Sequence, residues 1–229
     1  MTGVQTCALP IFPFDCSGSP YSIFAAGVVC PPQKISFPFS LIKLSDSSED
    51  AEFSGQRVLP GNEILPGWVL QHNAYALKRS EKKFRERDRT IRARINPAIL
   101  RPDIVDAMRD ALQRLTVAGG QASYTAGDLP GLGGNVLTEK SRLGAISTYG
   151  NWIDYYALEG LRLQLLERSL PAEAPEAVAL LQLVSDEGSW EHQRQVLVER
   201  QLVCGIPVLL ERLVHLAKEI AEGVERSRE

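Results

Sequence analysis

Apolar residues at helical spacing fill most of the chain after Pro60, and this periodicity constrains the fold more than any other feature. One set repeats every seven residues and so lies nearly in line along one side of a helix: Leu70, Leu77, Phe84 and Ile91. Pro66 suits the first turn of that helix, and Asn96-Pro97 ends it. The pattern predicts a helix over residues 66–95.

The two halves of this helix differ in polarity. Trp68 and Tyr75 lie on the side opposite the leucines, so residues 68–77 are apolar all round, and we expect them to be buried. This half should be the most buried element, touching both the β part and the later helices. The second half keeps only Phe84 and Ile91 among charged residues, and it should be exposed.

Further helices are predicted toward the C-terminus. Pro102 opens a helix whose apolar residues share one face: Ile104, Val105, Met108, Ala111, Leu112 and Leu115. Another helix carries Trp152, Tyr155, Tyr156, Leu163 and Leu166. Two or three more follow, and the last opens at Pro207 with Leu209, Leu213, Leu216, Ile220 and Val224 at helical spacing. Short connections imply antiparallel neighbours, so we expect a helical bundle.

A short β part precedes the helices. Two small apolar runs, residues 21–30 and 35–42, are bounded by Pro and Gly and are typical of strands, with Pro38 favouring an edge position for the second. The predicted fold is therefore mainly α, a helical bundle preceded by a β remnant. We divide the chain into that remnant (12–45), a polar linker (46–60), a helical region (61–117), a Gly-rich loop (118–135) and a C-terminal helical region (136–226).

Composition excludes several classes of function. The 229 residues carry a net charge of −3, which offers no global attraction to nucleic acid or anionic membrane. No run of about 20 apolar residues is present to cross a bilayer. Apart from Cys7, the cysteines Cys16, Cys30 and Cys204 are odd in number and show no framework spacing. A cytoplasmic protein is expected.

The first residues have an unusual origin. Reverse translation of residues 1–11 resembles a sequencing-library adapter read in frame, so we expect them to be dispensable and the biological sequence to be the C-terminal part of a longer chain. The segment also lacks the basic region and apolar core of a signal peptide.

Residues 78–94 form the most charged segment, with nine basic residues against Glu81, Glu86 and Asp88. One interpretation is a phosphate-binding patch, because Arg matches phosphate oxygens bidentately. The other is a solvated helix face with pairs such as Glu81–Arg85. Phe84 is the only aromatic residue in the segment, so stacking on single-stranded nucleic acid is poorly supported.

Other motifs carry little chemistry. The glycines between Gly119 and Gly134 match neither a P-loop nor a dinucleotide turn and indicate a connector. His72, His192 and His215 lie far apart in sequence, so no metal site or cofactor is predicted. His72-Asn73 is expected to be a satisfied polar pair in the buried half-helix, and the aromatic residues of 149–156 are expected to be core.

The charged helix nevertheless resembles a signature of a large uncharacterised bacterial family. The shared pattern is Asn-x-Tyr-Ala-Leu-x-Arg, then Lys and an Arg-Asp pair, which here is Asn73, Tyr75, Ala76, Leu77, Arg79, Lys83, Arg87 and Asp88. Members of that family carry a left-handed parallel β-helix, as in sugar-nucleotide pyrophosphorylases and acyltransferases, followed by a helical region. Residues 25–27 and 37–41 resemble the last β-helix coil and its exit.

The resemblance implies a function as well as an architecture. It implies the C-terminal region of a nucleotidyl- or acyltransferase-like protein acting on a sugar-nucleotide, trimeric through its β-helix, with the reaction centre elsewhere. The residues it nominates for contact with a phosphate-bearing ligand are Asn73, Tyr75, Arg79, Lys83, Arg87 and Asp88. The alternative is a non-catalytic helical module that binds a protein or RNA through residues 78–94.

Overall fold

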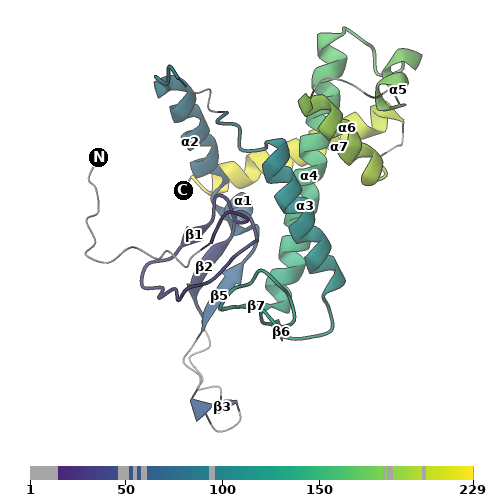
Figure 1. The fold of residues 1–229 in the computed structure, drawn as a ribbon. Helices are drawn as coiled ribbons and strands as arrows, with labels where there is room; N and C mark the ends of the chain where they lie inside the picture. The colour runs from purple at the N-terminus through teal and green to yellow at the C-terminus, as the bar shows by residue number, and fades with distance from the viewer. Residues whose placement is uncertain are drawn as a thin grey trace.

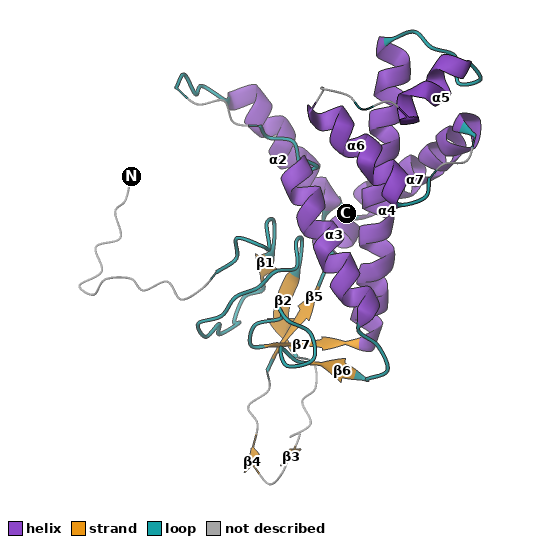
Figure 2. Cartoon of the chain, turned by 45° about the vertical axis from the view of Figure 1, so that its right-hand side comes forward, coloured by secondary structure: helices purple, strands orange, loops and turns teal. Residues whose placement is uncertain are grey.

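A computed structural model describes residues 15–45, 52–53, 56–57, 61–92, 96–182, 184, 188–202 and 205–228. Within them, helices make up most of the chain, and a five-stranded sheet lies at one end of the helical layer (Figure 2). The predicted mainly α fold with a short β part is confirmed. Residues 1–11, the helix end at 93–95 and Cys204 lie outside the described residues.

The sheet is mixed and gathers strands from distant parts of the sequence. Its order is β1-β2-β5-β7-β6, in which only the β1–β2 and β5–β7 pairs are parallel. The strands are β1 (Ile23–Phe24), β2 (Leu41–Leu44), β5 (Asn62–Leu65), β6 (Ser123–Tyr124) and β7 (Asn135–Thr138). A separate antiparallel pair, β3 (Glu52–Phe53) and β4 (Gln56–Arg57), falls in the segment predicted to be a linker.

The first two strands belong to a chain segment that coils back alongside itself. Ile23 pairs with Leu41 and Phe24 with Ile42, both in parallel and both 18 positions apart. Asp15 pairs in parallel with Lys34, 19 positions on. The hydrogen bonds Ile23 N to Ser40 O and Ala25 N to Ile42 O, each 2.8 Å long, connect the two passes. Residues 15–42 therefore form more than one full turn of a parallel coil.

Two expectations about the β part are wrong. β2 is not an edge strand, because it lies between β1 and β5; Pro38 precedes the strand, in a turn where Phe39 adopts a positive φ of 56°. The region after Pro60 is not wholly helical, since β5 and β7 are strands and β6 lies within the Gly-rich segment. These strands have two to four residues, too few for an alternating pattern to stand out in the sequence.

The long helix α4 (Glu139–Glu167) lies at the centre of the helical part, where it contacts α3, α6 and α7 (Figure 1). Thr138 caps its N-terminus by accepting a hydrogen bond from the backbone N–H of Ser141. The remaining helices are α1 (Trp68–His72), α2 (Ala74–Arg87), α3 (Pro102–Val117), α5 (Pro175–Gln182), α6 (Gly188–Glu199) and α7 (Ile206–Arg226). The predicted helices that start at Pro102 and near Pro207 are confirmed as α3 and α7.

The helix predicted over residues 66–95 is wrong at both ends and in the middle. It begins at Trp68, breaks at Asn73, whose φ of −141° is not helical, and ends at Arg87. The end has a local cause, since the Asp88 carboxylate accepts hydrogen bonds from both the N–H and the hydroxyl of Thr90. Such side-chain to backbone bonds compete with helix continuation.

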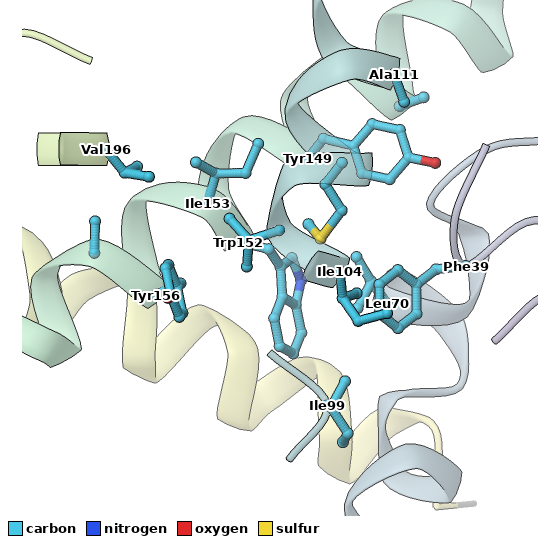
Figure 3. Packing of buried hydrophobic residues seen from close by; sticks show 14 of the residues in the cluster. Phe39, Leu70, Ile99, Ile104, Ala111, Tyr149, Trp152, Ile153, Tyr156 and Val196 are labelled. Carbon is cyan, nitrogen blue, oxygen red and sulfur yellow. The ribbon is translucent and has the colours of Figure 1, made fainter. Parts of the chain in front are cut away.

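The most buried helix is α4 rather than residues 68–77. The side chains of Tyr149, Ile153 and Leu161 have no exposed surface, and Trp152 is 8% exposed (Figure 3). In α1 and the start of α2, only Val69, Leu70, Ala74 and Leu77 are buried. The half-helix does touch both α7 and the β part, as predicted, because the N–H of Val69 donates to Phe39 O.

Candidate functional site

Helix α2 extends away from the helical layer as an arm (Figure 1). It carries six basic and two acidic residues in a protein of net charge −3. Arg85 pairs with Glu81, and Lys82 with Glu86 at 3.8 Å. In the described part of the chain, four cations of this arm form no ion pair: Lys78, Arg79, Lys83 and Arg87.

Two of the residues nominated by the resemblance lie where α1 meets α2. Asn73 is half-buried, and its carbonyl accepts the first hydrogen bond of α2, from the N–H of Ala76 at 3.1 Å. Tyr75 is also half-buried, and its backbone N–H donates to Ser227 Oγ at 3.1 Å, just beyond the C-terminal end of α7. Asn73 therefore starts α2, and Tyr75 connects the base of the arm to the residue that follows α7.

The other four nominated residues follow the arm outward. Arg79 and Arg87 are exposed, and Lys83 is half-buried. Asp88 is exposed at the tip, and its hydrogen bonds from Thr90 lower its pKa. From Asn73 to Asp88 the helical rise of about 1.5 Å per residue gives a separation of roughly 20 Å. The structure thus spreads the six residues along the arm instead of gathering them around one point.

The concave surfaces beside α2 are apolar. A groove of about 290 Å³ runs between α2 and residues 96–101, with Leu77, Phe84 and Ile99 in its walls. A second groove of about 210 Å³ lies between the base of α2 and α4, and its walls include Leu77, Ile99 and Trp152. Arg79, Lys83 and Arg87 line neither groove, whereas Lys78 lies at the edge of the second one.

A hydrogen-bonded chain that the sequence did not reveal crosses three helices. His192 Nε2 lies 3.0 Å from Asp106 Oδ1, and His192 Nδ1 lies 3.0 Å from the hydroxyl of Tyr156. Burial raises the pKa of Tyr156, which keeps the phenol protonated and unsuited to act as a nucleophile. The chain therefore joins α3, α6 and α4. No spacing pattern in the sequence predicts this chain of hydrogen bonds, because its three residues are up to 86 positions apart.

The Gly-rich segment packs against the coil. Gly131 and Gly133 have positive φ values of 96° and 65°, and a Cβ at Gly131 would lie 2.1 Å from Ser36 Oγ. The N–H of Gly134 donates to Gln33 Oε1 at 2.7 Å. Because these glycines serve a close approach and that N–H already has a partner, the segment acts as a packed connector. It offers no phosphate cradle of the kind built from free backbone N–H groups.

A groove between α1, α4 and α7 was not predicted. It has a volume of about 330 Å³, and its polar walls include Gln71, Asn151 and Arg226. These residues belong to three helices separated by more than 70 positions, so no local pattern in the sequence groups them.

Several other kinds of site are not found in the described residues. No cluster of three His, Cys, Asp or Glu side chains there is arranged to hold a metal ion. None of the described helices is both long and apolar enough to span a membrane. Cys16 and Cys30 carry free thiols whose pKa values are raised by burial.

No family model, curated protein or solved structure matched this chain.

Proposed function

We propose that this chain caps a parallel β-helix and that its helical layer ends the stack of coils. The observation that carries the proposal is the register of residues 15–42, where parallel partners are 18 or 19 positions apart. A triangular coil built from hexapeptides repeats every ~18 residues. This spacing supports the left-handed β-helix that the sequence resemblance implies.

The arrangement of the sheet supports the same proposal. Among the described strands β1 has one neighbour, β2, so its other edge offers backbone groups to a further parallel strand. Apolar side chains are exposed on and near this first pass, with Phe24 at 40% and Val29 at 80%. The last repeat of a repeat protein needs a capping element that covers its outer face. Here the antiparallel strand β5 pairs with the free edge of β2, and the helices follow it.

The proposed parent protein is a nucleotidyl- or acyltransferase-like enzyme acting on a sugar-nucleotide, with its reaction centre outside this chain. Recovery of the full gene tests this. We expect apolar residues at six-residue spacing before residue 15 and a trimer by light scattering of the full-length protein. A preceding sequence without that period, or a monomeric full-length protein, contradicts the proposal.

A second function is favoured by the arm. We propose that α2 binds an acidic protein surface, because four of its cations lack an acidic partner within the described residues, and three of these, Lys78, Arg79 and Arg87, are exposed. Electrostatic complementarity of this kind increases association rates and depends strongly on salt. RNA is disfavoured because neither aromatic residue of the arm lies free on its charged surface: Phe84 lines an apolar groove, and Tyr75 is half-buried at the base of the arm.

Binding of two polyanions separates these partners. We expect the protein to bind poly-glutamate at low salt, and the double variant Arg79→Glu, Lys83→Glu to lose that binding. The matched control is Lys218→Glu, which changes an exposed lysine of α7 outside the arm sequence. Tighter binding of an oligouridine RNA than of poly-glutamate overturns the choice of a protein partner. Equal binding by both variants overturns the role of the arm.

A further inference from the structure

The groove between α1, α4 and α7 has an apolar floor and a polar rim. Its floor is formed by Leu70, Trp152, Leu216 and Ile220, each at most 9% exposed. Polar side chains from all three helices stand around this floor: Gln71, Ser147, Thr148, Asn151, Glu219, Glu222 and Arg226. Gly223 of α7 also lines the groove and leaves space that a larger side chain would fill.

Most of the rim has no partner within the protein. In the part of the chain that the structure describes, five rim side chains form neither a hydrogen bond nor an ion pair: Gln71, Ser147, Asn151, Glu222 and Arg226. Donors and acceptors that converge on an apolar floor without partners are the usual composition of a small-molecule site.

The charges of the rim indicate which net charge of ligand the groove favours. Two carboxylates, Glu219 and Glu222, face one guanidinium, that of Arg226, so an anion meets net repulsion. His72, close to Arg226, has its pKa lowered by burial and by that guanidinium, which keeps the imidazole neutral at pH 7. A neutral ligand with several hydroxyl groups suits the rim, since carboxylates accept from hydroxyls while amides and guanidinium donate to them.

We propose that this groove binds a neutral sugar unit, with the ring packed over the apolar floor and its hydroxyls on Asn151, Gln71, Glu222 and Arg226. The volume of about 330 Å³ lies at the lower end of ligand sites, which suits one or two sugar rings. The proposal rests on this groove alone and does not require that the chain caps a β-helix.

Four neutral sugars test the proposal by saturation-transfer NMR and calorimetry: glucose, galactose, mannose and N-acetylglucosamine. Glucuronate and glucose 1-phosphate serve as anionic probes. We expect saturable binding of at least one neutral sugar and weaker binding of both anions. Asn151→Ala and Arg226→Ala should each weaken binding about tenfold, the effect of losing one polar contact.

Three further variants separate binding from folding. Gly223→Leu should abolish binding by filling the groove, while Gly223→Ala should have little effect, because a Cβ there would meet its nearest atoms at 3.9 and 4.0 Å. Arg228→Ala, which removes an exposed partner of Glu225 outside the groove, should leave binding unchanged. Every variant is first checked for an unchanged melting temperature. No binding of any neutral sugar, tighter binding of an anion, or equal binding by Asn151→Ala overturns the proposal.

Discussion

Tyr149 joins the central helix to the coil through a single hydroxyl group. Its side chain is fully buried, and its O–H donates to Pro38 O at 2.5 Å. Burial raises its pKa, so the phenol stays neutral and remains a donor. At the N-terminal end of α4, the carboxylate of Glu139 accepts from the guanidinium of Arg142 at 2.6 Å and from the hydroxyl of Tyr124 at 2.7 Å. Individual polar contacts therefore position the sheet against the helices.

Removing the Tyr149 hydroxyl should destabilise the protein. Tyr149→Phe leaves the buried Pro38 carbonyl without its donor, which costs about 1–3 kcal/mol in the free energy of unfolding. Urea denaturation measures the loss. Tyr155→Phe is the matched control, because Tyr155 lies on the same helix and its hydroxyl has no hydrogen-bond partner among the described residues. Equal losses in the two variants would show that the bond to Pro38 contributes nothing.

Ionisation of Glu139 should make the free energy of unfolding depend on pH. Hydrogen bonds from Arg142 and Tyr124 lower its pKa from 4.5 to about 2. A carboxyl with a depressed folded-state pKa contributes stability above its unfolded pKa and loses that contribution as pH falls. We expect the free energy of unfolding to fall between pH 4.5 and about 2, and to fall less in Glu139→Gln. The exposed Glu173→Gln is the control, and an unchanged pH profile in Glu139→Gln contradicts the prediction.

At the scale of elements, helical spacing of apolar residues predicts α3 and α7 correctly but fails along the arm. The apolar faces of α3 and α7 were recognised correctly, since Ile104, Met108 and Leu213 are all buried there. The same kind of stripe failed along α2, where Phe84 is half-buried and Ile91 is 98% exposed beyond the helix. Spacing reports which residues share a face. It does not report whether another element covers that face or where a local hydrogen bond ends the helix.

Leu77 and Ile91 should differ sharply when truncated. Leu77 is 8% exposed and lies between the two apolar grooves, whereas Ile91 is 98% exposed. Leu77→Ala should cost about 2–5 kcal/mol of unfolding free energy, toward the lower end because grooves already flank the site. Ile91→Ala should cost almost nothing, since little apolar surface is withdrawn from water there. Chemical denaturation compares them, and a larger loss at Ile91 would contradict the burial described here.

At the scale of the whole molecule, the coil and the helices share one hydrophobic core. Ile35, Phe37 and Phe39 have no exposed surface and belong to the same cluster as Met108 and Tyr149. β5 pairs with β2 of the coil, and β7 pairs in turn with β5. In the sequence β5 precedes α3 and β7 follows it, so the sheet connects regions that the sequence predicts to be separate. A boundary near residue 60 therefore does not separate two independent cores.

A chain that begins at Gly61 should consequently fail to fold. It lacks four core side chains with no exposed surface: Ile35, Phe37, Phe39 and Ile42. We expect it to lose the cooperative thermal transition in circular dichroism, because core losses of this size exceed the net stability of a domain, about 5–15 kcal/mol. A chain that lacks only residues 1–11 is the control and should keep the transition. A cooperative transition in the chain from Gly61 would show that the helical part folds alone.

The sequence by itself determined the mainly α class, the places of α3 and α7, the charge of the arm and its Glu81–Arg85 pair. Each of these follows from spacing or composition within one segment, because the interactions involved join residues that are close together in the sequence. Tertiary structure alone decided the order of the sheet, the His192–Tyr156 contact and the groove formed by Gln71, Asn151 and Arg226. Those features bring together residues tens to more than a hundred positions apart. Their contacts depend on how complete elements pack, and no pattern within one segment records that packing.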